Sequence, residues 1–225
     1  MTKAKIVRAR TQIEIPHSEG VLVVAHPFYG PANAKTLKEK INADGLREPT
    51  SREVALFAEA MYQGKEREQQ EATEIMKKNY LRAFTGILYV PETQLAHFVD
   101  FPKFDERSIV DKDDLTRRIE ESYAQVPFEH IREELVAWQD VAKHPYILAW
   151  AHGQEGAEKL AELASRHPRK EAYLWVPNVA NFKQPEARVA ALDDVRDGGR
   201  LGVNGSGDGD AGGVAFGVRV AEAQA

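Results

Sequence analysis

Three oxygen-bearing side chains near the C-terminus have the chemistry of cation ligands. Asn204, Asp208 and Asp210 lie close together in a glycine-rich stretch, and calcium accepts carboxylate and amide oxygens on flexible loops. Their spacing lacks the distal glutamate of an EF-hand and the period of a glycine-rich nonapeptide repeat. We therefore interpret this stretch as a flexible, acidic hairpin loop, with calcium binding as the alternative. No other cofactor is predicted.

His26 is the histidine best placed for catalysis, because it follows the β-branched run of residues 21–25. Residues just past the carboxyl end of a strand line the ligand crevice in α/β proteins. Residues 21–27 resemble the opening of the zinc-dependent sugar N-deacetylases, but Phe28 and Tyr29 stand where that family has its two acids. The seven histidines include no His-x-His and no His-Glu-x-x-His pair. We favour a histidine packed at a strand end, and a metal-assisted hydrolase with a site near His26 is an alternative.

The residues or motifs that several other kinds of site require are absent from the sequence. The chain contains no cysteine, which excludes disulfides, thiolate zinc sites, iron–sulfur clusters and cysteine nucleophiles. Gly205-Ser206-Gly207 is not the Gly-x-Ser-x-Gly of a nucleophile elbow, and no Gly-Lys-Ser/Thr follows the glycines as in a phosphate loop. The 30 Lys and Arg against 35 Asp and Glu give a net charge of −5, which argues against a broad nucleic-acid surface. The sequence therefore favours a protein that is not an enzyme.

The first half of the chain predicts alternating strands and helices. Its strongest local signal is a capping box, in which Thr50 caps a helix and Glu53, three residues on, bonds back to it. Pro27, Gly30 and Pro31 should end the second strand. Strands are expected over residues 5–15, 21–25 and 81–90, and helices over residues 34–41, 50–63 and 66–79.

The middle of the chain predicts helices and the last part predicts strands. After a connection over residues 91–110, helices should begin at Asp111, Pro127 and Pro145 and span residues 157–165, which makes a helical insertion or subdomain at about 105–168. Nine of the 16 glycines lie between positions 198 and 217, among apolar runs that indicate a glycine-rich β-region over residues 171–221. The expected fold is α+β, a single domain of residues 1–225 with a mixed or antiparallel sheet built from both chain ends.

Two segments together resemble a known family. Residues 45–54 read GLREPTSREV, and residues 173–175 and 215–219 read YLW and AFGVR. They resemble the Arg-Leu-Pro-Thr-x-x-Glu segment and the closing strand of bacterial and phage C-type-lectin-like domains, such as sulfatase-modifying-factor relatives and retroelement variable proteins. Glu48 replaces the usual leucine, and no catalytic cysteine of the formylglycine-generating type can exist here. The resemblance implies that both termini pair in one sheet, with display loops near the C-terminus, and implies binding more than catalysis.

These observations favour a non-enzymatic ligand-binding or display module with a C-type-lectin-like core. Large aromatic side chains beside adaptable Gly, Ser and Asn suit recognition surfaces, so the predicted ligand-binding residues are Trp175, Asn178, Asn204, Asp208 and Asp210. The ligand or protein partner is unknown. A structural protein that assembles into homo-oligomers is the other alternative. No apolar run approaches the ~20 residues that cross a bilayer, and no signal peptide is evident, so we expect a cytoplasmic protein without membrane contact.

Overall fold

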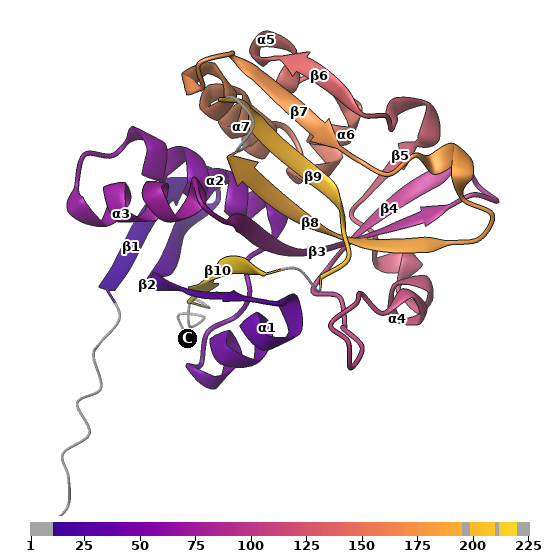
Figure 1. The fold of residues 1–225 in the computed structure, drawn as a ribbon, viewed down its shortest axis with the longest axis horizontal. Coiled ribbons are helices and arrows are strands. Elements are labelled where there is room, and N and C mark those ends of the chain that lie inside the picture. The colour runs from indigo at the N-terminus through magenta and orange to yellow at the C-terminus, as the bar shows by residue number, and fades with distance from the viewer. Residues whose placement is uncertain (1–10, 195–198, 210–211, 220–225) are drawn as a thin grey trace, which may run out of the picture.

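The computed structural model describes residues 11–194, 199–209 and 212–219 (Figure 1). These residues form ten strands in one mixed sheet, whose main path runs β1-β2-β10-β3-β8-β9-β7-β6, while β4 pairs with β3 and β5 with β4. No helix among them is long and apolar enough to span a membrane. The strands are β1 (Thr11–His17), β2 (Gly20–Ala32), β3 (Tyr80–Val90), β4 (Leu95–Asp100), β5 (Ala124–Pro127), β6 (Glu134–Ala137), β7 (Glu171–Trp175), β8 (Glu186–Asp194), β9 (Leu201–Gly207) and β10 (Gly213–Val218).

Strands from both parts of the sequence meet inside this sheet. The late strand β10 pairs antiparallel with β2 and parallel with β3, so it lies between two early strands. Helices lie between the strands in the middle of the chain. The α+β class predicted from the sequence, with a mixed sheet built from both chain ends, is confirmed.

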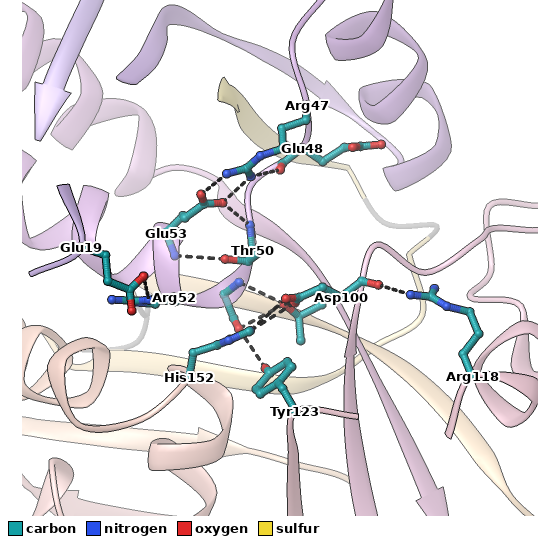
Figure 2. Close-up of polar contacts among 12 residues, drawn as sticks. Glu19, Arg47, Glu48, Thr50, Arg52, Glu53, Asp100, Arg118, Tyr123 and His152 are labelled. Carbon is teal, nitrogen blue, oxygen red and sulfur yellow. Dashed lines mark hydrogen bonds and ion pairs between the residues drawn. The ribbon is translucent and has the colours of Figure 1, made fainter. Parts of the chain in front are cut away.

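The helix α2 (Ser51–Gln63) begins with the predicted capping box. The Thr50 hydroxyl accepts a hydrogen bond from the backbone N–H of Glu53 (3.4 Å), and the Glu53 carboxylate accepts one from the backbone N–H of Thr50 (2.9 Å). Arg47 holds the same carboxylate with both terminal nitrogens (Figure 2). The family-like segment therefore fixes where α2 starts. The neighbouring helices α1 (Ala34–Ala43) and α3 (Arg67–Met76) also form near their predicted bounds.

The middle segment combines helices with strands. Its helices are α4 (Lys112–Arg117), α5 (Trp138–Val141), α6 (Pro145–Trp150) and α7 (Gln154–Arg166), with 3-10 turns η1 (Ile119–Glu121) and η2 (Phe128–His130). The long helix predicted from Pro127 is wrong, because β5, η2, β6 and α5 occupy that stretch. Val136 is buried between exposed Leu135 and Ala137, the alternation of a strand, and β6 pairs antiparallel with β7.

Two strands run further than the sequence indicates, and one strand forms where a connection is expected. β2 continues to Ala32, because Pro27 and Pro31 each fall within a register shift of the β2–β10 pair, where a ladder hydrogen bond is not required. β4 lies inside the expected connection, and β9 extends through Gly207 into the expected loop. The structure of these segments is determined by pairing with strands that are distant in the sequence, and local composition does not indicate this pairing.

Side chains on the two faces of the sheet belong to different cores. On one face the main core packs α2, α6 and α7 against the strands, with Phe57, Trp150 and Leu160 fully buried. On the other face, one cluster lies under α1 and another under α4; they are centred on Leu37 and Leu115 respectively. Adjacent residues of β3, β8 and β10 alternate between these cores. The described helices cover the second face only in part.

Candidate binding face and groove

The sheet face opposite α7 is uncovered at β6, β7 and β9. Figure 1 shows α7 behind β7 and β9, whose near side carries no helix. Leu174 of β7 points into the main core, so its neighbours Tyr173 and Trp175 point outward. Leu135 of β6 lies opposite Tyr173, and Asn204 of β9 lies beside Trp175. We call Leu135, Tyr173, Trp175, Asn204 and Ser206 the open face.

The open face carries large apolar side chains in a fixed arrangement. Trp175 is 50% exposed and Leu135 is 47% exposed. The rings of Tyr173 and Trp175 meet edge to face, with centroids 5.8 Å apart. Exposed apolar groups that gather in one place mark interaction sites more often than single ones do. The only other exposed large apolar side chains in the described part of the chain are Val21 and Trp138.

A groove of about 480 Å³ lies at one end of the open face. Its walls come from the turn before β6, from the segment after β7 and from the end of β9. It is lined by Ile131, Arg132, Glu133, Trp175, Val176, Pro177, Asn178 and Ser206. The structure therefore brings the predicted Trp175 and Asn178 to one groove, which we call the Trp175 groove, and adds a serine from the glycine-rich segment.

A bulge in β9 places Asn204 and Ser206 on the open face. The β8–β9 register shifts between Val189 and Ala191, at the level of Gly205. The carbonyl of Gly205 accepts a hydrogen bond from the Tyr89 hydroxyl (2.9 Å), and the carbonyl of Asn204 accepts one from the Trp150 indole (3.1 Å). Buried aromatic donors thus satisfy the backbone groups that the bulge removes from the ladder.

Glycine is required at position 205 by the close approach of a second tyrosine. A β-carbon there would overlap the hydroxyl of Tyr146, which lies 3.2 Å from the hydroxyl of Tyr89. Both tyrosines are fully buried, and burial raises both phenol pKa values, to well above the usual range in Tyr146. Close packing against the tyrosines therefore explains why the glycine-rich segment has a glycine at position 205.

The two predicted asparagines use their side-chain oxygens locally. The Asn204 oxygen accepts hydrogen bonds from the backbone N–H (2.8 Å) and hydroxyl (3.3 Å) of Ser206. The Asn178 oxygen accepts from the backbone N–H of Ala180 (3.2 Å) and caps the 3-10 turn η3 (Val179–Asn181). These bonds fix the side chains, so the amide N–H groups are what each can offer to a ligand.

Asp208 lies away from the Trp175 groove, and Asp210 lies outside the described residues. An Asp208 carboxylate oxygen is 3.4 Å from Nε of Arg188, and its carbonyl accepts from the backbone N–H of Val110 (3.2 Å). The described residues contain no group of three or more acidic or histidine side chains placed to hold a metal ion. Calcium binding at Asn204, Asp208 and Asp210 stays a prediction.

His26 is packed in β2 and is 6% exposed. Its Nε2 atom lies 3.5 Å from a carboxylate oxygen of Glu71 on α3, and its ring meets Phe28 edge to face at 5.9 Å. The arrangement is that of a buried histidine at the edge of the main core. Among the described residues, His26 and Glu71 are not joined by a third acidic or histidine side chain placed to hold a metal ion.

Charged groups border the Trp175 groove. Arg132 lies 3.2 Å from a carboxylate oxygen of Glu134, and His144 lies 3.2 Å from the other oxygen. Partial burial opposes ionisation of Glu134, but the hydrogen bonds from Arg132 and His144 outweigh it and lower its pKa. Burial and the nearby charge of Glu133 raise the pKa of Tyr173. The rim of the Trp175 groove therefore carries paired charged side chains, and its centre is aromatic.

Sequence reasoning missed four contributors to this region: Leu135, Tyr173, Arg132 and Ser206. The spacing of Ile131, Leu135 and Trp138 predicts that Leu135 lies on the apolar side of a helix, but its neighbour Val136 is the buried residue of a short strand. The alternation of Tyr173, Leu174 and Trp175 gave a usable signal, because a strand with one buried face must expose the first and third residues. Nothing local indicates that Ser206 lies beside Asn178.

The described structure is similar to a solved structure from Nanoarchaeota in which the C-type lectin fold accommodates massive sequence variation. The two share 11% sequence identity and superpose with a TM-score of 0.58 over 94% of this chain and 99% of the other. This chain has the C-type lectin fold. The resemblance seen in the sequence is thereby confirmed at the level of the fold, without cysteines. The sequence matches no protein-family model and no curated protein.

Proposed function

We propose that this C-type-lectin-fold protein is a non-enzymatic binding module that takes a protein or peptide partner on the open face and in the Trp175 groove. The observation that carries this proposal is the uncovered part of the sheet, where Leu135, Tyr173 and Trp175 are presented beside a groove. Tryptophan and tyrosine dominate the energetics of protein interfaces.

The chemistry around these anchors supports a recognition surface. Asn178, Asn204 and Ser206 provide polar groups whose positions are fixed by local hydrogen bonds, and the ion-paired Arg132 and Glu134 lie at the border. An apolar aromatic centre with a polar rim is the common anatomy of an interface. The related structure from Nanoarchaeota is described as accommodating massive sequence variation, which suits a fold whose exposed residues can change without loss of the core.

Selection of peptide ligands with matched variants tests this function. A phage-displayed library of random peptides is panned against the protein, and the affinity of each selected peptide is measured by isothermal calorimetry. We expect Trp175→Ala to weaken binding by about tenfold or more. The control is Trp138→Ala, which removes another partly exposed tryptophan that does not line the groove. A library that yields no peptide dependent on Trp175 contradicts the proposal.

Light scattering of the same variants tests whether the partner is a second copy of the chain. If the open face is a homo-oligomer contact, the protein is larger than a monomer and Trp175→Ala, but not Trp138→Ala, returns it to a monomer. A monomer at high concentration leaves an unrelated protein or peptide as the proposed partner.

A further inference from the structure

A second groove lies beside His152, and neither the open face nor the Trp175 groove includes it. Its volume is about 490 Å³, and it is bounded by the start of β5, by α6 and by the turn between α6 and α7. Apolar and polar atoms contribute about equally to its exposed lining, and two side chains present nitrogen or oxygen atoms. The apolar walls are Ala124, Pro145, Leu148 and Ala149, and the polar ones are Gln125 and His152.

The backbone of His152 has a left-handed conformation, which residues other than glycine rarely adopt. Its φ angle is +57°, and that of the next residue, Gly153, is +102°. The turn is closed by hydrogen bonds from the N–H of His152 to the carbonyl of Ala149 (3.2 Å) and from the N–H of Gly153 to the carbonyl of Leu148 (2.7 Å). These two bonds form the common left-handed cap at the C-terminal end of α6, and the cap fixes the backbone of His152 at the edge of the groove.

Asp100 and Tyr123 fix the imidazole ring from two sides. Nε2 of His152 lies 3.0 Å and 3.3 Å from the two carboxylate oxygens of Asp100. The Tyr123 ring stacks on the imidazole, with centroids 3.3 Å apart (Figure 2). A neutral imidazole that donates through Nε2–H keeps its lone pair on Nδ1. No hydrogen bond from the described residues reaches that Nδ1 atom.

Buried hydroxyl groups and an arginine hold Asp100 in place. The Thr85 hydroxyl donates to the Asp100 carboxylate (2.6 Å) and accepts from the backbone N–H of Ser51 (3.0 Å). Arg118 donates to the backbone carbonyl of Asp100 (2.9 Å) (Figure 2). Ser51 and Thr85 have no exposed surface. They therefore position the aspartate and cannot themselves meet a molecule in the groove.

The same cluster keeps Tyr123 a hydrogen-bonding phenol. Its oxygen lies 3.5 Å from the Ser51 hydroxyl, and burial, followed by the negative charge of Asp100, raises its pKa well above the usual value. The hydroxyl thus points toward the buried cluster while the ring lines the groove. Among the side chains that line the groove, His152 is the one whose ring is held on two sides, by Asp100 and by Tyr123.

We propose that this His152 groove is a second binding site, which takes an O–H or N–H donor carried on an apolar body, with Nδ1 of His152 as the acceptor. The apolar walls would contact the body of the ligand, and the Asp100–His152 pair would receive its donor. A ring fixed by a carboxylate and a stacked aromatic is preorganised, which lowers the cost of binding. The proposal does not depend on the open face. A free small molecule and a tyrosine side chain of a partner protein both have this chemistry.

Nitrogen NMR with two matched probes tests the proposal. In ¹⁵N-labelled protein we expect His152 to be protonated at Nε2 and not at Nδ1. Phenol should shift the Nδ1 resonance saturably, whereas anisole, of similar shape but without the donor, should not. Protonation at Nδ1, an equal response to both probes or no response to phenol overturns the proposal.

Three variants separate the His152 groove from the rest of the molecule. His152→Asn keeps a residue that tolerates the left-handed backbone and should weaken phenol binding about tenfold or more, followed through the backbone amides of Gln125 and Ala149. Leu148→Ala alters an apolar wall without touching Asp100 and should weaken binding severalfold with the tautomer unchanged. Trp175→Ala should leave phenol binding unchanged even where peptide binding is lost. Retention of phenol binding in both groove variants overturns the proposal.

A second pair of probes distinguishes the two sources of the donor. N-acetyltyrosinamide and N-acetylphenylalaninamide differ only in the phenolic hydroxyl. Stronger binding of the tyrosine derivative supports recognition of a side chain from a partner protein. Binding of phenol with exclusion of both derivatives supports a small free molecule at the same groove.

Discussion

The start of α2 and the bulge of β9 are both held by hydrogen bonds to backbone groups, but the partners come from different distances along the chain. At α2, Thr50 and Glu53 satisfy one another across three positions. At β9, the donors to Asn204 and Gly205 are Trp150 and Tyr89, which lie 54 and 116 positions away. The first segment specifies its own structure, whereas the second takes its structure from the core beneath it.

This difference separates two roles within one fold. The segment around Thr50 holds its helix by local contacts, and its side chains are committed to that task. In β9 the backbone and glycines meet the core, so Asn204 and Ser206 can point outward from a strand whose position is set elsewhere. Because the core holds β9 through its backbone, the outward side chains of Asn204 and Ser206 are not needed to hold the strand.

The largest effect we expect is at Gly205. A β-carbon at this position would overlap the Tyr146 hydroxyl, and both tyrosines beneath are fully buried. Overpacking and loss of the buried hydrogen bonds should destabilise Gly205→Ala by about 3 kcal/mol in urea denaturation. Gly212→Ala is the control, because a β-carbon there meets nothing within 4 Å. Equal stability of the two variants would show that the core does not hold β9.

A smaller effect is expected at the capping box of α2. Thr50→Ala removes the side-chain oxygen that accepts from the backbone N–H of Glu53, and loss of such a cap costs about 1 kcal/mol. Thr50→Ser keeps the oxygen and should recover most of that stability in the same urea titration. If alanine and serine behave alike, the bidentate contact of Arg47 with Glu53 is sufficient to hold the start of the helix.

Glu155 gives a long-range contact at the surface, and its effect should be pH-dependent. Partial burial opposes its ionisation, but hydrogen bonds from Ser18 and Arg52 outweigh this and lower its pKa from 4.5 to about 2. A lowered folded-state pKa stabilises the protein above the unfolded value, so the contribution is present above about pH 4.5 and is lost as the pH falls toward 2. Because the side chain is 26% exposed, solvent screening should reduce this to about 1 kcal/mol or less.

Measuring the free energy of unfolding of Glu155→Gln between pH 2 and pH 7 checks this contribution. The variant should be less stable than the natural chain at pH 7, and the difference should shrink as the pH falls through this range. A constant difference would mean that the Ser18 and Arg52 contacts do not depend on the charge.

The same distinction explains how much could be predicted from the sequence. The capping box, α1, α3, β3 and β7 follow from spacing and local propensity, and the resemblance to the C-type lectin fold follows from the residues around the capping box and in β7 and β10. The helical spacing of Ile131, Leu135 and Trp138 predicts a helix from Pro127, yet the pairing of β6 with β7 makes a strand within this stretch. Trp175 and Asn178 do lie together in one groove, but their neighbour Ser206 arrives through the parallel pairing of β7 with β9. The His152–Asp100 contact joins residues 52 positions apart, and no local pattern reports it.

The smallest effect on stability is expected at Asp208, which follows β9 but lacks the core contacts of Gly205. Its carboxylate is about half exposed and lies 3.4 Å from Arg188, and an exposed pair of this kind contributes little. Asp208→Ala should therefore change the free energy of unfolding by no more than about 0.5 kcal/mol in calcium-free buffer.

Melting with and without calcium tests the metal site with the same variant. If calcium is bound by Asn204, Asp208 and Asp210, calcium raises the melting temperature of the natural chain and not that of Asp208→Ala, and EDTA removes the difference. If the segment is only a surface, both melt alike in either buffer. A loss well above 0.5 kcal/mol without calcium would show that the core-dependent part of this region extends past the end of β9.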